Sequence, residues 1–130
     1  MAVTAKTFEY AVELDRGGRM TIPGGGQLLP PEGWLADHLL LAALVRCSID
    51  SFAYHARRAG HDVTASGSAQ GTITKTGDDD RYRFVSIDVL IEAQLAPRAS
   101  DVAALIAKAE RDCFVGASLT VKPEYEWRVS

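Results

Sequence analysis

The sequence predicts a single α+β domain over residues 1–130, in which β-strands are combined with one long helix and one shorter helix. Segments with alternating apolar and polar residues, typical of strands, occur before, between and after the helical segments. The stretch from Trp34 to Arg58 contains neither proline nor glycine and is rich in alanine and leucine, which favours a long helix. The 130 residues, 47% hydrophobic and 24% charged, suit one globular domain. Without a repeat or a linker, the order of elements favours the α+β class.

The N-terminal segments are expected to form a β-hairpin. Residues 4–14 alternate apolar and polar side chains, which predicts the first strand. Residues 15–18, Asp-Arg-Gly-Gly, have the composition of a tight turn, and residues 19–22 are expected to return as the second strand. Pro23-Gly24-Gly25-Gly26 should end this strand, and residues 28–32, with two prolines, are expected to be an irregular connection.

The long helix is expected to be central. Leu39 to Val45 is apolar on every face of a helix, which predicts burial on all sides rather than a position on the surface. Gly60 is expected to end the helix, after Arg57 and Arg58, whose charges suit a helix C-terminus.

The C-terminal half predicts two strands, a helix and a closing strand. Residues 63–75 alternate with small residues on one face, and residues 82–95 are the clearest strand of the chain. Ser100 is expected to cap a helix over residues 101–112, and residues 119–129 to form the last strand. In the clearest strand we assign Val85, Ile87, Val89, Ile91 and Ala93 to one face, and Phe84, Ser86, Asp88, Leu90, Glu92 and Gln94 to the other.

Composition and charge exclude several classes of partner. Fourteen Lys and Arg residues against 17 Asp and Glu residues give a net charge of −3, so we expect no nucleic-acid or anionic-membrane binding. The longest apolar run, Leu39 to Val45, is far shorter than the ~20 residues that span a bilayer. The N-terminus lacks a signal-peptide pattern, which favours a cytoplasmic location. The three histidines, His38, His55 and His61, lack metal-ligand spacing, and we expect no metal or other cofactor.

The two cysteines, Cys47 and Cys113, are too few for a disulfide scaffold or a usual zinc cluster. One reading is that both are buried apolar residues. A reactive cysteine, by contrast, needs a nearby cation, a hydrogen-bond donor or a helix N-terminus to stabilise its thiolate. Arg46 points about 100° away from Cys47 on the helix, and Cys113 lies at the end of a helix, where the dipole disfavours a thiolate. Activation of either thiol therefore requires a residue from another element.

In three segments, residues 37–47, 109–119 and 16–19, the chain resembles motifs of the OsmC/Ohr family, the osmotically inducible and organic hydroperoxide resistance proteins. The family's helix motif, in which an acidic residue precedes a reactive cysteine by ten positions, resembles Asp37-His38-Leu39-Leu40-Leu41-Ala42-Ala43-Leu44-Val45-Arg46-Cys47. A second motif, a helix-ending cysteine followed by serine and an apolar residue, resembles Ala109-Glu110-Arg111-Asp112-Cys113-Phe114-Val115-Gly116-Ala117-Ser118-Leu119. The hairpin turn that carries the family's arginine resembles Arg16-Gly17-Gly18-Arg19. In order and spacing, the resemblance covers nearly the whole chain.

The resemblance implies antiparallel sheets wrapped around a long central helix, an intertwined homodimer, and reduction of organic hydroperoxides to alcohols without a cofactor. Cys47 would be the peroxidatic thiol, and Cys113 would resolve its sulfenic acid to a disulfide that a dithiol reductant then opens. Arg16, or alternatively Arg19, would stabilise the thiolate, and Asp37 would hold that arginine. Asp37 stands where the family usually has glutamate, and Phe114 stands where it usually has proline.

Helix geometry is consistent with that dimer. Ten helical residues at ~1.5 Å each separate Asp37 from Cys47 by about 15 Å, too far to share a site within one helix. Two antiparallel copies related by a twofold axis could bring Asp37 of one chain toward Cys47 of the other.

Two other functions remain open from the sequence. The chain could be a non-catalytic OsmC-like dimer that binds a small molecule or serves a structural role, with inert buried cysteines. A hotdog thioesterase also wraps a sheet around a long helix at this size, but paired cysteines have no use in that chemistry.

Overall fold

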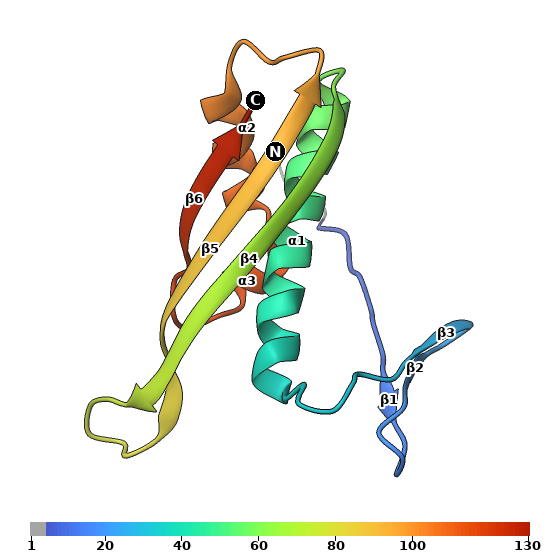
Figure 1. Cartoon of the computed structure of the whole chain (residues 1–130), viewed down its shortest axis with the longest axis vertical. Coiled ribbons are helices and arrows are strands. Elements are labelled where there is room, and N and C mark those ends of the chain that lie inside the picture. Colours follow the sequence, from blue (N-terminus) through green and yellow to red (C-terminus); the bar gives the residue numbers. More distant parts are fainter. Residues whose placement is uncertain (1–4) are drawn as a thin grey trace. The chain divides into compact units, whose positions relative to one another are not determined.

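A computed structural model describes residues 5–130 of the chain. They divide after Leu35 into two compact units, each with its own three-stranded sheet (Figure 1). One long helix and two sheets confirm the α+β class. The expectation of one domain over residues 1–130 stays a prediction, and each unit is described below by itself.

The expected hairpin is present in the N-terminal unit, but its first strand is shorter than predicted. Strand β1 covers only Glu13–Leu14 and pairs antiparallel with β2, Met20–Ile22. The turn between them is held by Asp15, whose Oδ1 accepts hydrogen bonds from the amides of Gly17 and Arg19 at 2.8 and 2.9 Å. Residues 5–12 form no regular structure, and Thr4 lies outside the described residues. Alternation alone does not make a strand, because β2 pairs with only two residues of that segment.

A third strand, which the sequence did not predict, follows in the same unit. The glycine-rich segment was expected only to break the chain, yet β3, Gly25–Leu28, pairs antiparallel with β2. Gly24, with φ of 75°, occupies the left-handed region that favours glycine, and this tight turn sends the chain back along β2.

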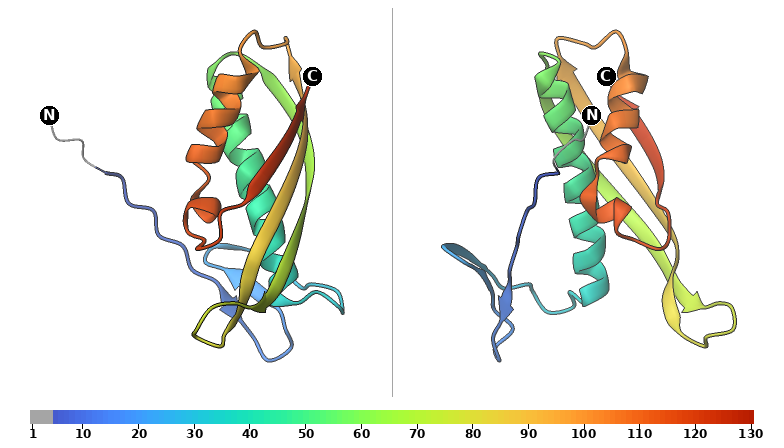
Figure 2. Two further views of the ribbon diagram at one scale, coloured as in Figure 1. Left: turned by 90° about the vertical axis from the view of Figure 1, so that its left-hand side faces the viewer. Right: turned by 180° about the vertical axis from the view of Figure 1, so that it is seen from behind.

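The C-terminal unit is a sheet with helices on one face (Figures 1 and 2). The helices are α1 (Ala36–Arg58), α2 (Val102–Arg111) and the short α3 (Phe114–Ala117). The strands are β4 (Asp62–Lys75), β5 (Tyr82–Ala96) and β6 (Glu124–Val129), in the order β4-β5-β6. β4 and β5 form a long antiparallel hairpin, whereas β6 lies parallel to β5. This parallel return brings Tyr125 of β6 to Ser48 of α1, the helix that carries Cys47.

The core lies between α1 and β5. The expected apolar face of β5 is confirmed, because Ile87, Val89, Ile91 and Ala93 are buried. The expectation that α1 is buried on every side is wrong for the single chain. Its inward face is buried through residues such as Leu44, Phe52, Ala53 and Ala56, but other positions, including Ala42 and Ala43, are exposed. By length and composition α1 could also cross a membrane, a test that a core helix meets equally well.

Two glycines of β4 let α1 approach the sheet closely, in agreement with the small residues predicted on this face. A Cβ atom on Gly67 would lie 2.8 Å from Ile91 Cδ1 and 3.0 Å from Val45 Cγ1 on α1. A Cβ atom on Gly71 would lie 2.6 Å from the ring of Phe84. Neither position has room for a side chain.

Three further predictions in the C-terminal half need correction. A β-bulge between Thr72 and Ile73 skips Val85 in the β4–β5 register, so Phe84 joins the core against Gly71 rather than the outer face. Helix α2 is capped by Asp101 rather than Ser100, because Asp101 Oδ1 accepts the amide of Ala104 at 3.1 Å. The last strand begins at Glu124 rather than Leu119.

Candidate active site

Cys47 lies in the middle of α1, on the side that contacts α3, and is half-buried. Its Sγ accepts a hydrogen bond from the backbone amide of Val115 in α3, at an N–Sγ distance of 3.5 Å. The loop and short helix that follow α2 therefore return to the middle of α1 and contact its thiol.

The surroundings of Cys47 raise the pKa of its thiol above the ordinary value. Burial is the main cause, because removing the thiolate from water costs free energy. The amides of Val115 and Phe114 act in the opposite direction by donating hydrogen bonds to the sulfur. Cys113 raises the pKa further, through a hydrogen bond between the two thiols and through charge repulsion. Cys47 also packs against the buried cluster that contains Cys113, so the structure brings the two thiols together although they are 66 residues apart in sequence.

Cys113 is fully buried and caps the start of α3. Its Sγ accepts a hydrogen bond from the amide of Gly116 at 3.5 Å. The sequence placed this cysteine at the C-terminal end of a helix, where the dipole disfavours a thiolate. In the structure α2 ends at Arg111 and α3 begins at Phe114, so the nearest backbone partner of the sulfur is an amide donor.

A pair of hydroxyl groups, from Ser48 and Tyr125, borders Cys113 and was missed by sequence reasoning. Ser48 is 1% exposed, and its Oγ donates to the carbonyl of Leu44 at 2.8 Å. The same Oγ lies 3.0 Å from the Tyr125 hydroxyl on β6 and 3.6 Å from Cys113 Sγ. Burial raises the pKa of Tyr125 to about 12, so its hydroxyl remains protonated at neutral pH.

The segment that leads to Cys113 is fastened to α1 by polar contacts. His55 Nε2 lies 2.7 Å from Oδ2 of Asp112, the residue directly before Cys113 in the chain. Arg111 donates to both carboxylate oxygens of Asp112 at 2.9 Å and, with His55, lowers the Asp112 pKa to about 2. Further along, Ser51 Oγ donates to the carbonyl of Ala109 at 2.9 Å. These bonds hold the end of α2 against α1 and so fix where the second thiol lies.

The other expected site residues lie on two different parts of the chain. Asp37 is exposed in the first turn of α1, on the same helix as Cys47. Arg16 and Arg19 are exposed at the β1–β2 turn of the N-terminal unit. The grouping of Arg16, or of Arg19, with Asp37 and the thiols stays a prediction.

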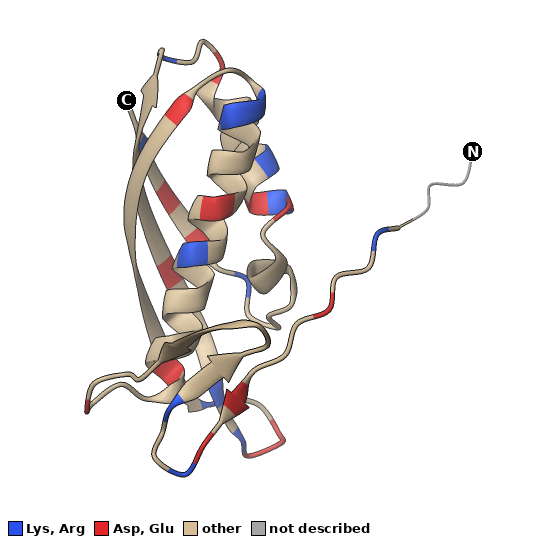
Figure 3. Cartoon of the chain, turned by 90° about the vertical axis from the view of Figure 1, so that its right-hand side faces the viewer, with Lys and Arg blue, Asp and Glu red and all other residues tan. Residues whose placement is uncertain are grey.

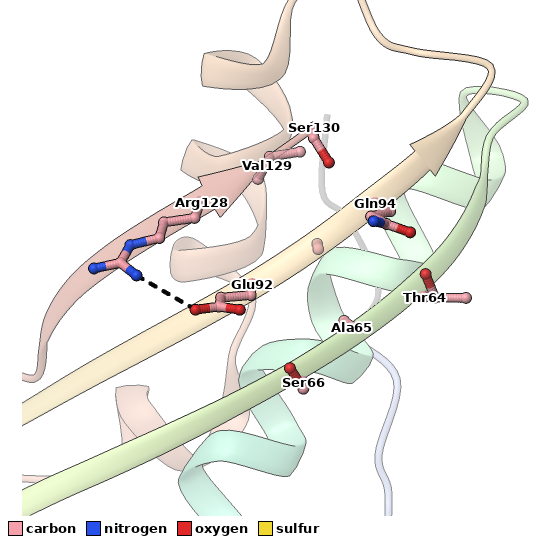
Figure 4. A pocket seen from close by; sticks show the side chains of 9 residues that line it. Thr64, Ala65, Ser66, Glu92, Gln94, Arg128, Val129 and Ser130 are labelled. Carbon is pink, nitrogen blue, oxygen red and sulfur yellow. Dashed lines mark hydrogen bonds and ion pairs between the residues drawn. The ribbon is translucent and has the colours of Figure 1, made fainter.

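The outer face of the sheet has a different character from the thiol site. A hollow of about 730 Å³ lies there, lined mainly by polar side chains, with Arg128 Nη1 3.4 Å from Glu92 Oε1 (Figure 4). Neither cysteine lines it. Basic and acidic residues are interspersed over the chain (Figure 3). Over residues 5–130, no three His, Cys, Asp or Glu side chains gather as metal ligands.

A search of protein-family models matches residues 30–128 to the family described as OsmC-like protein. The chain belongs to this family. The match spans α1 and both cysteines, whereas the Arg16–Arg19 turn lies outside it. A search of curated proteins found no match.

Solved structures agree with an OsmC-like fold. An OsmC-like protein from Mycoplasma pneumoniae has a TM-score of 0.71 at 14% identity, with 97% of this chain and 99% of that chain covered. The organic hydroperoxide resistance protein OsmC from Legionella pneumophila gives 0.57 at 18% identity, over 98% and 99%. The organic hydroperoxide resistance protein OhrB of Bacillus subtilis gives 0.56 at 15% identity, over 96% and 98%. At these identities the likeness concerns the fold.

Proposed function

We propose that this OsmC-like chain is a thiol-dependent peroxidase that reduces organic hydroperoxides to alcohols. The observation that carries the proposal is the pairing of a half-exposed thiol, Cys47, with a fully buried thiol, Cys113, at the same turn of α3. Two structurally similar proteins are named organic hydroperoxide resistance proteins, which supports the same substrate class.

The reaction divides into two steps of sulfur chemistry. The Cys47 thiolate attacks the distal oxygen of the hydroperoxide, the O–O bond breaks, and the alkoxide takes up a proton and leaves as the alcohol. Cys47 is then a sulfenic acid. Cys113 attacks this sulfur, hydroxide leaves as water after protonation, and a Cys47–Cys113 disulfide forms. The peroxide gains two electrons, which the two thiols lose.

Formation of the Cys47 thiolate requires a positive charge, because burial and the neighbouring thiol both raise the pKa of Cys47. We assign this charge to Arg16, with Arg19 as the alternative, and the orientation of the arginine to Asp37. Within one helix Asp37 is about 15 Å from Cys47, which favours donation of Asp37 by a second copy of the chain. The exposed alanines Ala42 and Ala43 of α1 leave a surface that such a copy can cover.

The disulfide is reset by a dithiol reductant in the cytoplasm. Cys113 is 0% exposed, so an incoming thiolate reaches Cys47 first and displaces Cys113. The second thiol of the reductant then releases Cys47. The cycle needs no metal or organic cofactor.

A non-catalytic role in binding a small molecule, or a structural role, is the second candidate. The raised pKa of Cys47 favours it, because a protonated thiol is a poor nucleophile. Under this alternative the paired thiols would react with hydroperoxides no faster than an ordinary free cysteine.

The two candidates are separated by turnover. The purified chain should convert cumene hydroperoxide to its alcohol in the presence of dithiothreitol, and Cys47→Ser should abolish this conversion. Cys113→Ser should still consume about one equivalent of peroxide per chain when no reductant is present. If the parent converts cumene hydroperoxide no faster than Cys47→Ser does, the proposed peroxidase is refuted.

A further inference from the structure

The chemistry proposed above leaves unexplained a pair of hydroxyl groups beside the resolving thiol, one buried (Ser48) and one half-buried (Tyr125). Ser48 follows Cys47 in α1 but faces the core, and Tyr125 comes from β6, 77 residues away. Their oxygens are 3.0 Å apart, and Ser48 Oγ is 3.6 Å from Cys113 Sγ. A Cβ atom built on Gly116 would lie 3.4 Å from both Cys113 Sγ and the Tyr125 hydroxyl oxygen, so both groups border the same glycine.

The hydroxyl pair has more hydrogen-bonding capacity than the reduced state uses. Ser48 donates its only proton to the carbonyl of Leu44 at 2.8 Å, an acceptor that also serves the helix. The lone pairs of Ser48 Oγ are then free to accept from Tyr125 and from the Cys113 thiol. A hydroxyl proton rotates at little cost, so the same oxygen can donate to sulfur when the sulfur carries a negative charge.

We propose that the Ser48–Tyr125 hydroxyl pair stabilises Cys113 as a thiolate while the disulfide forms and breaks. This role in the cycle rests on the proposed peroxidase function. With Cys113 protonated, Ser48 Oγ accepts hydrogen bonds from the thiol and from the Tyr125 hydroxyl. With Cys113 ionised, the Ser48 O–H turns toward Sγ and donates, beside the amide of Gly116. The Tyr125 hydroxyl, which also interacts with Cys113, donates to the same sulfur.

The electron balance explains why such donors are needed. When a reductant thiolate attacks Cys47 Sγ, a new S–S bond forms, the Cys47–Cys113 bond breaks, and its electron pair goes to Cys113. Cys113 therefore becomes negative at a site with no exposed surface, where water cannot solvate it. A hydrogen bond to a charged group is stronger than one between neutral groups, so the hydroxyl pair favours this released thiolate. Solvent supplies the proton that later neutralises it.

The direct test measures the pKa of Cys113 in a Cys47→Ser background, where Cys113 is the only thiol. The probe is the ultraviolet absorbance of the thiolate as the pH is raised, minus the same titration of the chain with both cysteines replaced. The pKa of Tyr125 is about 12, and that of Asp112 is about 2. Neither group therefore changes its charge over the pH range in which a cysteine ordinarily titrates. Replacement of Cys47 removes the one titrating thiol that interacts with Cys113.

Ser48→Ala should raise the pKa of Cys113 by about one to two units, the size expected from loss of a hydrogen bond to a charged group. Tyr125→Phe should raise it in the same direction, and it carries the test if Ser48→Ala does not fold. Ser86→Ala is the control, because it removes an exposed hydroxyl from β5 that takes no part in holding either thiol. A Cys113 pKa unmoved by both variants, or moved equally by the control, overturns the proposal.

A second measurement follows the disulfide itself. With the disulfide formed by diamide rather than by a hydroperoxide, reduction by dithiothreitol should be about tenfold slower in Ser48→Ala, since a more basic thiol is a poorer leaving group. Equal rates in Ser48→Ala and the parent would contradict the proposal. Because neither measurement uses a peroxide, failure of the parent to react with cumene hydroperoxide would refute the peroxidase alone.

Discussion

The sulfur of Cys47 is subject to opposing influences that are all visible at the scale of single residues. Burial and the neighbouring Cys113 thiol favour the protonated form, and two backbone amides favour the thiolate. Burial is the largest of these effects, so the pKa is raised. None of these influences comes from a cation, so the proposed peroxidatic role of Cys47 calls for one from another element.

Arg16→Ala tests where that cation comes from. Loss of one close opposite charge should raise the Cys47 pKa by about one to three units and slow peroxide reduction steeply. Arg19→Ala should have a markedly smaller effect, and Asp37→Asn an intermediate one, because Asp37 orients the arginine without taking part in bond formation. The rate of alkylation by iodoacetamide as a function of pH measures the pKa. If Arg19→Ala has the larger effect, the arginine assignment is reversed, and if Cys47 reactivity is unchanged in both, neither arginine activates it.

Asp112 predicts a specific acid sensitivity. Its pKa is lowered from 3.8 to about 2, first by the hydrogen bonds from Arg111 and also by His55. The ionised carboxylate therefore stabilises the fold above about pH 4, and this contribution is lost as the pH falls from about 4 toward 2. Asp112→Asn should lose less stability than the parent over that interval, as measured by urea unfolding at each pH. Asp50→Asn, which removes an exposed ion pair with Arg46, is the control. Parallel stability curves for Asp112→Asn and the parent would contradict the assignment.

At the scale of elements, the packing of α1 on β4 depends on missing side chains. A Cβ on Gly67 would lie 2.9 Å from the carbonyl oxygen of Leu90, a backbone atom that cannot move without disturbing the β4–β5 ladder. Gly67→Ala should therefore destabilise the fold by about 1–3 kcal/mol, in the range of an overpacked core. Ser66→Ala, next to it on the exposed face, should change stability by no more than about 0.5 kcal/mol. Urea unfolding measures both, and a Gly67→Ala variant as stable as the parent would show that α1 has room to move.

The sequence predicted those elements whose pattern is local and long. The extent of α1 follows from a long stretch without proline or glycine that is rich in alanine and leucine, and the buried face of β5 follows from hydrophobic alternation. The bulge that turns Phe84 into the core, and the return strand β3, depend on pairing between strands and leave no periodic signal. The four residues of α3 are too few for a helical pattern to be recognised.

The candidate site likewise has one part that the sequence predicted and one part that it did not. Cys47 and Cys113 stood out because their flanking residues resemble family motifs, and the structure places the two thiols together. The Ser48–Tyr125 hydroxyl pair could not be predicted, because it depends on β6 pairing in parallel with β5, which brings Tyr125 beside Val89. No local feature of residues 119–129 distinguishes that tyrosine from an ordinary strand residue.

At the scale of the whole molecule, the exposed part of α1 predicts a homodimer. A helix this apolar normally buries more than one face, and positions such as Ala42 and Ala43 are uncovered in the single chain. Light scattering at micromolar concentration should give twice the 14.0 kDa of one chain. A mass of one chain under these conditions would contradict both the dimer and the donation of Asp37 across it.

The most direct test of the peroxidase is the number of free thiols before and after one equivalent of cumene hydroperoxide. The reduced chain has two, and the reaction should leave none in the denatured protein, with one peptide pair joined by a Cys47–Cys113 disulfide in the mass spectrum. Dithiothreitol should restore both thiols, and Cys47→Ser should keep its single thiol under the same treatment. Two free thiols remaining in the parent, with the peroxide unconsumed, would show that the paired cysteines are inert.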